Sequence, residues 1–419
     1  MTPYHTTTAH LCINSERLRD DFEQVSAIGQ TPDRGVCRLA LSMEDLEARA
    51  WFANRIEEAG FLVRDDDAGN LSGVLLSSSP RARTLLIGSH LDTVPNAGRY
   101  DGALGIVAAL ECLRTISEAG IKLPNHLEVI DFTDDEGTWM PMFGSMSLTG
   151  RLNPSFMKGA NGQAALFRAA LAQAGIHPED VLNARRDPAT VLGYIEMHIE
   201  QGWRLERGQI EIGVVTGIVA RMSYSLTFHG QATHAGTASM RERHDALQGA
   251  ARFITRAHEL VREHYPEGAL NCTGLEVRPG TLTTVPGEAR LLVEWRHTSQ
   301  ALLDEMERGL LALAQECAAA ANVTVETRRL AHIPAAQMSP VVIDAIERAC
   351  KIVGVTHTRM ASYASHNAQV MSAFTPTGML FIPSLNGISH NPDEFSRWED
   401  VVKGTNVLLH AIIELASNG

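Results

Sequence analysis

Short apolar runs alternate with longer amphipathic stretches through the first half of the chain. Ser42, with Asp45 three residues on and Gly60 as a stop, predicts a helix over residues 42–59. An Ala- and Leu-rich stretch predicts a second helix over about 103–117. Apolar runs predict strands at 61–64, 71–76, 84–88, 127–132 and 192–197. This alternation predicts a mostly parallel sheet with helices on both faces.

The pattern changes near residue 214. A strand pattern at 219–228 precedes an amphipathic helical stripe over 244–264. Further elements are predicted at 270–277 (strand), 290–295 (strand), 301–320 (helix) and 323–327 (strand). This βαββαβ order is that of a ferredoxin-like unit. We therefore expect an α+β module of residues 214–330, inserted into an α/β domain of residues 1–213 and 331–419.

The α/β pattern resumes after residue 330. It predicts a helix over 341–353 and a strand over 379–382. A last helix is expected to begin at Ser396, because Glu399 three residues later completes a capping-box pattern.

The net charge of −13 argues against a nucleic-acid or anionic-membrane partner, since both require basic surfaces. The six cysteines are scattered without a CxxC pattern, which indicates reduced thiols. No apolar run approaches ~20 residues, so no membrane span is expected, and the polar N-terminus lacks a signal core. The expected compartment is the cytoplasm.

Metal-binding residue types follow several of the predicted strands. His90 and Asp92 follow the strand at 84–88, and their spacing suits a metal-bound imidazole oriented by a carboxylate. The alternative is a surface His–Asp pair. Asp101 precedes the helix at 103–117, where an isolated aspartate would be a helix cap.

Three further segments offer ligands at strand ends. Asp134, Asp135 and Glu136 repel one another unless a cation is near, although a solvated acidic turn is the competing interpretation. His198 ends a further strand, and His390 lies in a loop after the last one, where a lone histidine is usually solvent-exposed. A ligand-type residue in all five segments is much less probable by chance than in one. In open α/β sheets, the strand ends meet at the edge where ligands bind.

Three histidines, one aspartate and one glutamate, without cysteine, suit Zn²⁺, with Mn²⁺ or Co²⁺ as alternatives. Two cations ~3.5–4 Å apart need a bridging carboxylate, for which Asp101 is the natural candidate. A bound water would then ionise near neutral pH, and an adjacent carboxylate would pass its proton to a leaving nitrogen.

The sequence resembles the hydantoinase/carbamoylase family of amidohydrolases, part of the zinc aminoacylase/carboxypeptidase superfamily. The resemblance covers nearly the whole chain. It rests on residues 35–42 (GVCRLALS), 88–93 (GSHLDT), 100–105 (YDGALG), 198–202 (HIEQG), 234–237 (HAGT), 285–287 (VPG) and Ser389-His390.

The resemblance implies that one metal is held by His90, Asp101 and His198, and the other by Asp101, Glu136 and His390. It implies that Asp135 is the general base. The inserted module would act as a lid and homodimer interface.

The resemblance also implies the substrate contacts. His234, from this chain or from a partner subunit, would stabilise the developing oxyanion. Arg296 and Gln201 would bind the carboxylate or amide of a small-molecule substrate. The remaining substrate-contact positions of the family fall on Thr283, Ser365 and His366. Arg296 as a strand-end salt bridge and His234 as a turn residue without a catalytic role are the alternatives.

Four positions depart from the family pattern. Asp135 replaces the usual Glu, and a base displaced by about 1 Å can lose ~10²-fold in rate. Trp139 replaces an Arg, Thr283 an Asn, and Asn367 the Asp of a Gly-His-Asp-Ala motif.

The resemblance and the ligand set lead to one primary hypothesis, metal-dependent hydrolysis of a carbamoyl or ureido C–N bond. The substrate would be a small carboxylate such as an N-carbamoyl-L-amino acid or allantoate. The alternatives are an N-acyl-amino-acid deacylase or dipeptidase of the same superfamily, and a metal-binding protein that has lost catalysis.

Overall fold

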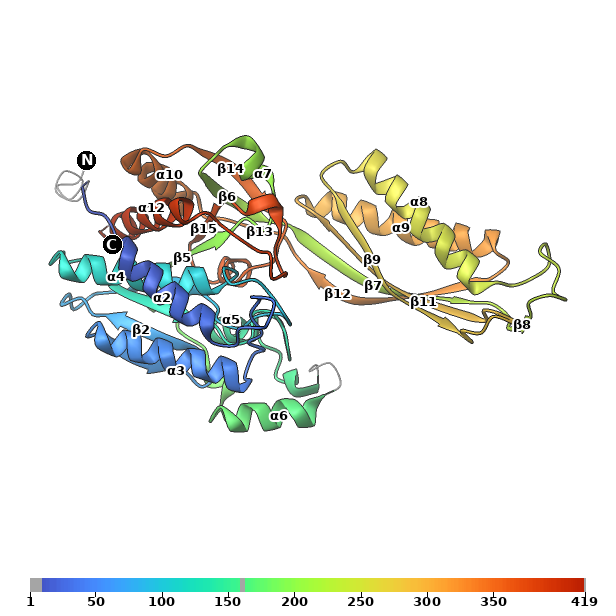
Figure 1. Cartoon of the computed structure of the whole chain (residues 1–419), viewed down its shortest axis with the longest axis horizontal. Coiled ribbons are helices and arrows are strands. Elements are labelled where there is room, and N and C mark those ends of the chain that lie inside the picture. The colour runs from blue at the N-terminus through green and yellow to red at the C-terminus, as the bar shows by residue number, and fades with distance from the viewer. Residues whose placement is uncertain (1–9, 159–162, 418–419) are drawn as a thin grey trace. The chain divides into compact units, whose positions relative to one another are not determined.

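The structure, a computed structural model, describes residues 10–158 and 163–417 (Figure 1). The chain forms two compact units. The first comprises Met1–Thr216 and Gln337–Gly419, and the second comprises Gly217–Ala336. No helix among the described residues is long and apolar enough to cross a membrane.

The first unit is built on one large mixed sheet, with strand order β1-β2-β4-β3-β5-β15-β6-β13 and with β14 paired to β6. Its strands are β1 (Leu62–Asp65), β2 (Leu71–Leu75), β3 (Thr84–Ser89), β4 (His126–Asp131), β5 (Val191–Ile199), β6 (Ile212–Ile218), β13 (Ala336–Gln337), β14 (His357–Ser362) and β15 (Thr377–Ile382).

The four central strands, in the order β4-β3-β5-β15, are parallel to one another. Almost every residue of these strands is buried, so helices and loops cover both faces of the sheet. Parallel strands end at the same edge, and the loops that follow β3, β4, β5 and β15 therefore meet there.

Helices α4, α10 and α12 pack against the central strands and in part against one another, and α2 packs on α4. The helices of this unit are α2 (Ser15–Ala27), α3 (Met43–Glu58), α4 (Ala103–Glu118), α5 (Phe143–Leu148), α6 (Ala164–Gln173), α7 (Arg204–Gly208), α10 (Pro340–Val353), α11 (Asn367–Met371) and α12 (Trp398–Ser417). Helix α3 begins as expected, with the Ser42 hydroxyl accepting the N–H of Asp45.

The second unit is an antiparallel sheet, order β12-β7-β11-β9, with α8 and α9 packed on it (Figure 1). Burial alternates residue by residue along β11, as expected of a strand with one covered face. The elements are β7 (Ala220–His229), α8 (Ala246–His264), β9 (Ala269–Arg278), β11 (Glu288–His297), α9 (Gln300–Ala320) and β12 (Thr324–Ile333), with a separate short pair of β8 (Thr233–His234) and β10 (Thr284–Val285).

The predicted fold class, a mostly parallel α/β sheet with a separate ferredoxin-like α+β unit, is confirmed. One local expectation is wrong. The capping box at Ser396 is wrong: α12 begins at Trp398, and the Ser396 hydroxyl donates to the carbonyl of Pro383. Strand β6 was not predicted, because its apolar residues continue directly into those of β7.

Candidate metal centre

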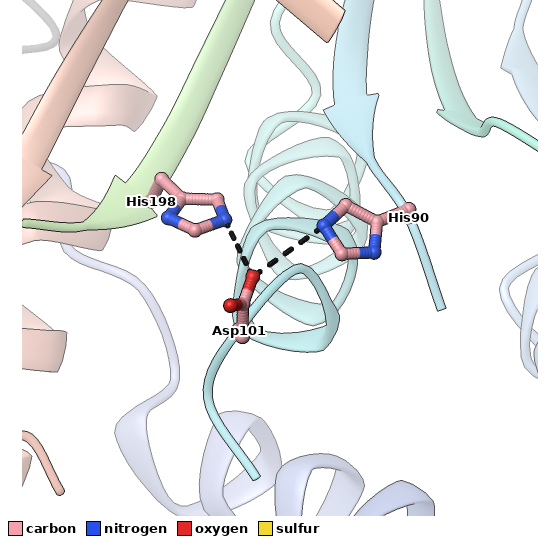
Figure 2. A group of neighbouring side chains, drawn as sticks. All are labelled: His90, Asp101 and His198. Atoms are coloured by element: carbon pink, nitrogen blue, oxygen red, sulfur yellow. Dashed lines mark ion pairs between the residues drawn. The ribbon is translucent and has the colours of Figure 1, made fainter. Parts of the chain in front are cut away.

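Two imidazoles and one carboxylate converge at the edge where the central strands end (Figure 2). His90 follows β3, His198 lies near the end of β5, and Asp101 lies just before α4. Nε2 of His198 is 3.0 Å from Oδ1 of Asp101, and Nε2 of His90 is 3.5 Å from the same oxygen. All three side chains are buried, and one carboxylate oxygen thus faces both rings.

The tautomers of the two rings follow from their other nitrogens. Nδ1 of His90 is 2.9 Å from the main-chain oxygen of Asp92, and Nδ1 of His198 is 2.9 Å from that of Ile199. A carbonyl oxygen only accepts hydrogen bonds, so each Nδ1 carries the hydrogen. A neutral ring then directs its Nε2 lone pair at the Asp101 carboxylate. Two acceptors that face each other need a proton or a metal cation between them, and this donor set fits a bound metal ion.

A second group shares the other oxygen of Asp101. Nε2 of His390 is 3.2 Å from Oδ2 of Asp101 and 3.5 Å from Oε1 of Glu136. In each group of three residues the candidate ligand atoms lie within 4.8 Å of one another. The first group is buried, whereas the His390 side chain in the second is 47% exposed. The two groups therefore form an adjacent pair of candidate cation positions with Asp101 between them.

The backbone near the candidate ligands has a positive φ at several positions. Gly102 has a φ of 66°, and a Cβ at this position would overlap the His90 ring. His390 and Gln201 each have a φ of 54°, in the left-handed region that costs free energy for residues other than glycine. Such strain persists only where surrounding contacts enforce it, and it is typical of functional sites.

The electrostatics of both groups also favour a bound cation. Burial and the neighbouring Asp101 carboxylate raise the pKa of Glu136 to about 9. Burial opposes ionisation of Asp101 as well, but His198 and the other two rings hold its pKa well below the usual range. Burial opposes protonation of His198, yet Asp101 outweighs it and raises the pKa of that ring to about 8. In the metal-free protein, protons thus offset the repulsion that a divalent cation would remove.

Asp135 lies beside this pair of groups. Its Oδ2 is 3.5 Å from Nε2 of His90, and its Oδ1 is buried without a hydrogen-bond partner among the described residues. Burial raises the pKa of Asp135 to about 7, against the lowering effect of His90. A carboxyl group with a pKa near neutrality and one unpaired oxygen suits proton transfer.

The carboxylate of Asp92 has a different contact from the one expected. It lies 3.7 Å from Nδ1 of His90, whose closer partner is the main-chain oxygen of Asp92. Its two oxygens instead accept the main-chain N–H groups of Asp135 and Glu136, each at 3.1 Å. Asp92 therefore orients His90 through its backbone and holds the Asp135–Glu136 loop through its side chain.

Three other expected substrate contacts lie in the first unit. Nε2 of Gln201 donates to Oδ2 of Asp101 at 2.8 Å, and its Oε1 is buried without a partner in the described chain. The His366 ring packs against His198 with 4.5 Å between ring centroids. Ser365 precedes it in the loop before α11. Gln201 and His366 thus touch the candidate ligands directly.

His234, Thr283 and Arg296 belong to the second unit. His234 is exposed on β8, and the Thr283 carbonyl accepts the N–H of Ala235. Arg296 on β11 forms an ion pair with Glu294, with 2.6 Å between Nη2 and Oε1. Because these three residues belong to the other unit, their part in one site with the cluster stays a proposal.

Two departures from the family pattern have clear surroundings. The Trp139 ring stacks on Phe167, with centroids 5.5 Å apart, and its indole N–H donates to the carbonyl of Ala40. It therefore serves the packing of the core. Asn367 is fully buried, and neither its Nδ2 nor its Oδ1 has a hydrogen-bond partner within the described residues.

Two buried glutamates of this site were not predicted. Glu196 on β5 accepts the hydroxyl of Ser89 and the N–H of Ala368. Glu394 lies against the loops of Asp101 and His390. The only sequence signal was that Glu196 lies two residues before His198 and Glu394 four residues after His390, which is common for residues without any such role.

Comparison with known proteins agrees with this geometry. Residues 86–414 match the family described as Peptidase family M20/M25/M40. An N-carbamoyl-L-amino acid amidohydrolase from Geobacillus stearothermophilus is 35% identical over 407 residues, covering 96% of this chain and 99% of that relative. Allantoate amidohydrolase from Escherichia coli strain K12 is 30% identical over 412 residues, covering 96% and 98%.

Solved structures give the same result. An amidase of the hydantoinase/carbamoylase family from Burkholderia multivorans superposes with a TM-score of 0.87 at 30% identity, covering 97% of this chain and 99% of that one. The chain therefore belongs to the M20/M25/M40 peptidase family and, within it, to the hydantoinase/carbamoylase amidohydrolases, enzymes that act on C–N bonds other than peptide bonds.

Proposed function

We propose that this protein hydrolyses the carbamoyl or ureido C–N bond of a small carboxylate, with two divalent cations as cofactors. The observation that carries the proposal is that the two groups of candidate ligands share Asp101. The first group faces Oδ1 of its carboxylate, and the second faces Oδ2. Zn²⁺ suits the mixed nitrogen and oxygen ligands best, and Mn²⁺ or Co²⁺ suit them as well.

His90, Asp101 and His198 would hold one cation, and Asp101, Glu136 and His390 the other. When bound, such a pair of cations polarises a carbonyl group and lowers the pKa of water. Asp135 would take the proton from the attacking water on its unpaired Oδ1 and deliver it to the leaving nitrogen. Its buried position and pKa near 7 support this assignment.

Recognition of the substrate would involve both units. In the first unit, Gln201, Ser365 and His366 would contact the amide, since Gln201 and His366 already touch the ligand residues. Arg296 of the second unit would bind the carboxylate with its guanidinium fork, and Thr283 would be a separate contact with the substrate. His234 would stabilise the oxyanion. In this proposal the second unit is a lid that also forms a homodimer. The edge of β9, which pairs with no further strand of the described residues, supplies a surface for it.

The names of the two relatives suggest the first substrates, N-carbamoyl-L-amino acids and allantoate. Deacylation of N-acyl amino acids and dipeptide cleavage are the alternatives, because the family also contains peptidases. Only hydrolysis of a ureido group releases ammonia from these substrates, and ammonia therefore separates the two classes.

The experiment is a substrate panel with ammonia detection, run on protein whose metal content has been measured. We expect ammonia from at least one N-carbamoyl amino acid or ureide, and loss of that activity on metal removal. A fully metal-loaded protein that releases only amino acids from N-acyl substrates would replace the proposal with the deacylase alternative. No turnover of any substrate, by wild type or by Asp135→Glu, would leave a metal-binding protein without catalysis.

A further inference from the structure

Glu394 lies in the loop after His390, and its side chain is almost fully buried at 3% exposure. It points toward the segment that leads into α4. Gly98 in that segment leaves the space for it, because a Cβ at position 98 would overlap the Cβ and carboxyl group of Glu394. Two segments far apart in sequence therefore meet at this one side chain.

The carboxylate of Glu394 is hydrogen-bonded to two of the three loops that carry second-group ligands. Its Oε1 accepts the main-chain N–H of Tyr100 at 2.9 Å and that of Asp101 at 3.0 Å. Its Oε2 accepts the hydroxyl of Ser389, the residue before His390, at 2.6 Å. One oxygen thus binds the backbone of Asp101, and the other binds the side chain of Ser389, next to His390.

These contacts are unusual for a buried carboxylate. Within the described residues, no Lys or Arg forms an ion pair with Glu394, and its partners are two amides and one hydroxyl. Burying such a charge without a cationic partner is costly, so packing alone gives no reason for a glutamate here. A glutamine would offer only one acceptor oxygen to the three donors.

The contacts do account for the geometry of the second ligand group. His390 has a φ of 54°, a strained conformation that needs support from its neighbours. The Ser389 hydroxyl that Glu394 accepts is also 3.3 Å from Oδ2 of Asp101, the oxygen that faces His390. Glu394 and the Ser389 hydroxyl therefore connect the Asp101 and His390 loops at the point where their side chains face each other.

We propose that Glu394 is a positioning residue that joins the Asp101 and His390 loops and thereby holds the second ligand group ready for its cation. This inference rests on the proposed function, because it assumes that Asp101, Glu136 and His390 bind a metal ion. It assigns Glu394 no contact with the substrate or the cation.

The test measures Zn²⁺ binding to the full-length protein after chelator treatment, by ion count per chain and by competition with a chromophoric chelator. Wild type is expected to bind two ions. In Glu394→Ala, one of the two ions should bind about 10–100-fold more weakly, the usual effect of losing a residue that orients ligands. Glu394→Gln should lose less affinity for this ion, because the amide carbonyl oxygen can still accept the N–H groups of Tyr100 and Asp101.

Two further variants reach the same contact from its other side. Ser389→Ala removes only the hydroxyl link, and Gly98→Ala displaces Glu394 without deleting it. Both variants should weaken the binding of one ion, as Glu394→Ala does. In protein loaded with Co²⁺, each should change the visible absorption of one ion and leave that of the other, a signature that general destabilisation does not produce.

Glu128→Gln is the matched control, since Glu128 is a fully buried carboxylate that pairs with Arg186. It should lower the melting temperature while both ions bind as in wild type. Wild type that binds fewer than two ions would contradict the proposed function itself. Two ions in wild type, with unchanged affinities in folded Glu394→Ala and Ser389→Ala, would overturn only the role of Glu394. Equal weakening by Glu128→Gln would overturn it too.

Discussion

The main-chain N–H of Glu136 donates a hydrogen bond to the carboxylate of Asp92, with 3.1 Å between the nitrogen and Oδ2. The N–H of Asp135 donates to the other oxygen of the same carboxylate. Asp92 thus joins the loop after β3 to the loop after β4, and it fixes one candidate ligand and the candidate base together. Its side chain acts on the backbone of the neighbouring loop more closely than on the His90 ring.

The first prediction concerns Asp92. Asp92→Ala removes both hydrogen bonds to the Asp135–Glu136 loop, so we expect metal affinity to fall by about 10–100-fold. Asp92→Asn should lower metal affinity less, because its amide carbonyl oxygen still accepts one of the two N–H groups. Chelator competition measures both. The exposed Asp65→Asn serves as the control, and an unchanged affinity in Asp92→Ala would contradict the role of this contact.

The second prediction concerns the number of ions per chain. Asp101 belongs to both groups of candidate ligands, whereas His198 and His390 belong to one each. Asp101→Ala should therefore retain no tightly bound ion, while His198→Ala and His390→Ala should each retain one. Elemental analysis of purified variants gives the count. His234→Ala in the second unit should keep both ions, and equal losses in all four variants would argue against two separate positions.

The third prediction separates the candidate base from the metal ligands. Asp135→Asn removes the proton acceptor, so turnover should fall by roughly 10²–10⁴-fold while both ions stay bound. Asp135→Glu restores the residue usual in the family and should keep activity. Rates and metal content are measured on the same preparations. Undiminished turnover in Asp135→Asn would remove Asp135 as the base.

The fourth prediction concerns substrate recognition by the second unit. Arg296→Ala should raise KM for a carboxylate substrate about 10-fold or more, since a hydrogen bond to a charged group contributes roughly 1.5–3 kcal/mol. The value of kcat should change less. Arg290→Ala, on the same strand, is the matched control. An unchanged KM would argue against Arg296 as a substrate contact.

The fifth prediction is a pH dependence of stability that involves no candidate ligand. Burial raises the pKa of Asp45 to about 6, although the nearby Arg49 opposes this. The folded state therefore holds this proton more tightly than the unfolded state, and the resulting stability is lost as pH rises from about 4 through 6.

Asp45→Asn removes this ionisation and keeps an oxygen that can accept the N–H of Leu41. Its free energy of unfolding relative to wild type should therefore increase between pH 4 and pH 8, by at most roughly 3 kcal/mol. Urea unfolding at the two pH values measures the change. Glu44→Gln, exposed on the same helix, should show none. A difference of opposite sign would mean that Arg49 outweighs burial at Asp45.

The sequence determined the elements whose signals are local. The Ser42 cap, the apolar runs of β3, β4, β5 and β15, and the helical stripe of α8 each depend on neighbours along the chain. From parallel strands alone it followed that the residues after them would meet at one edge. The structure brings His90, Asp101, Glu136, His198 and His390 together there.

Only the tertiary structure decided which atoms meet. His90 contacts the main-chain carbonyl of Asp92, and His390 has a left-handed backbone conformation. Both features depend on contacts between distant segments. Glu394 contacts Asp101 from 293 positions away, and no local periodicity encodes such a pair. Local patterns fix where a strand ends, because they depend on burial and backbone preference, whereas side-chain contacts across loops depend on the packed arrangement of the whole unit.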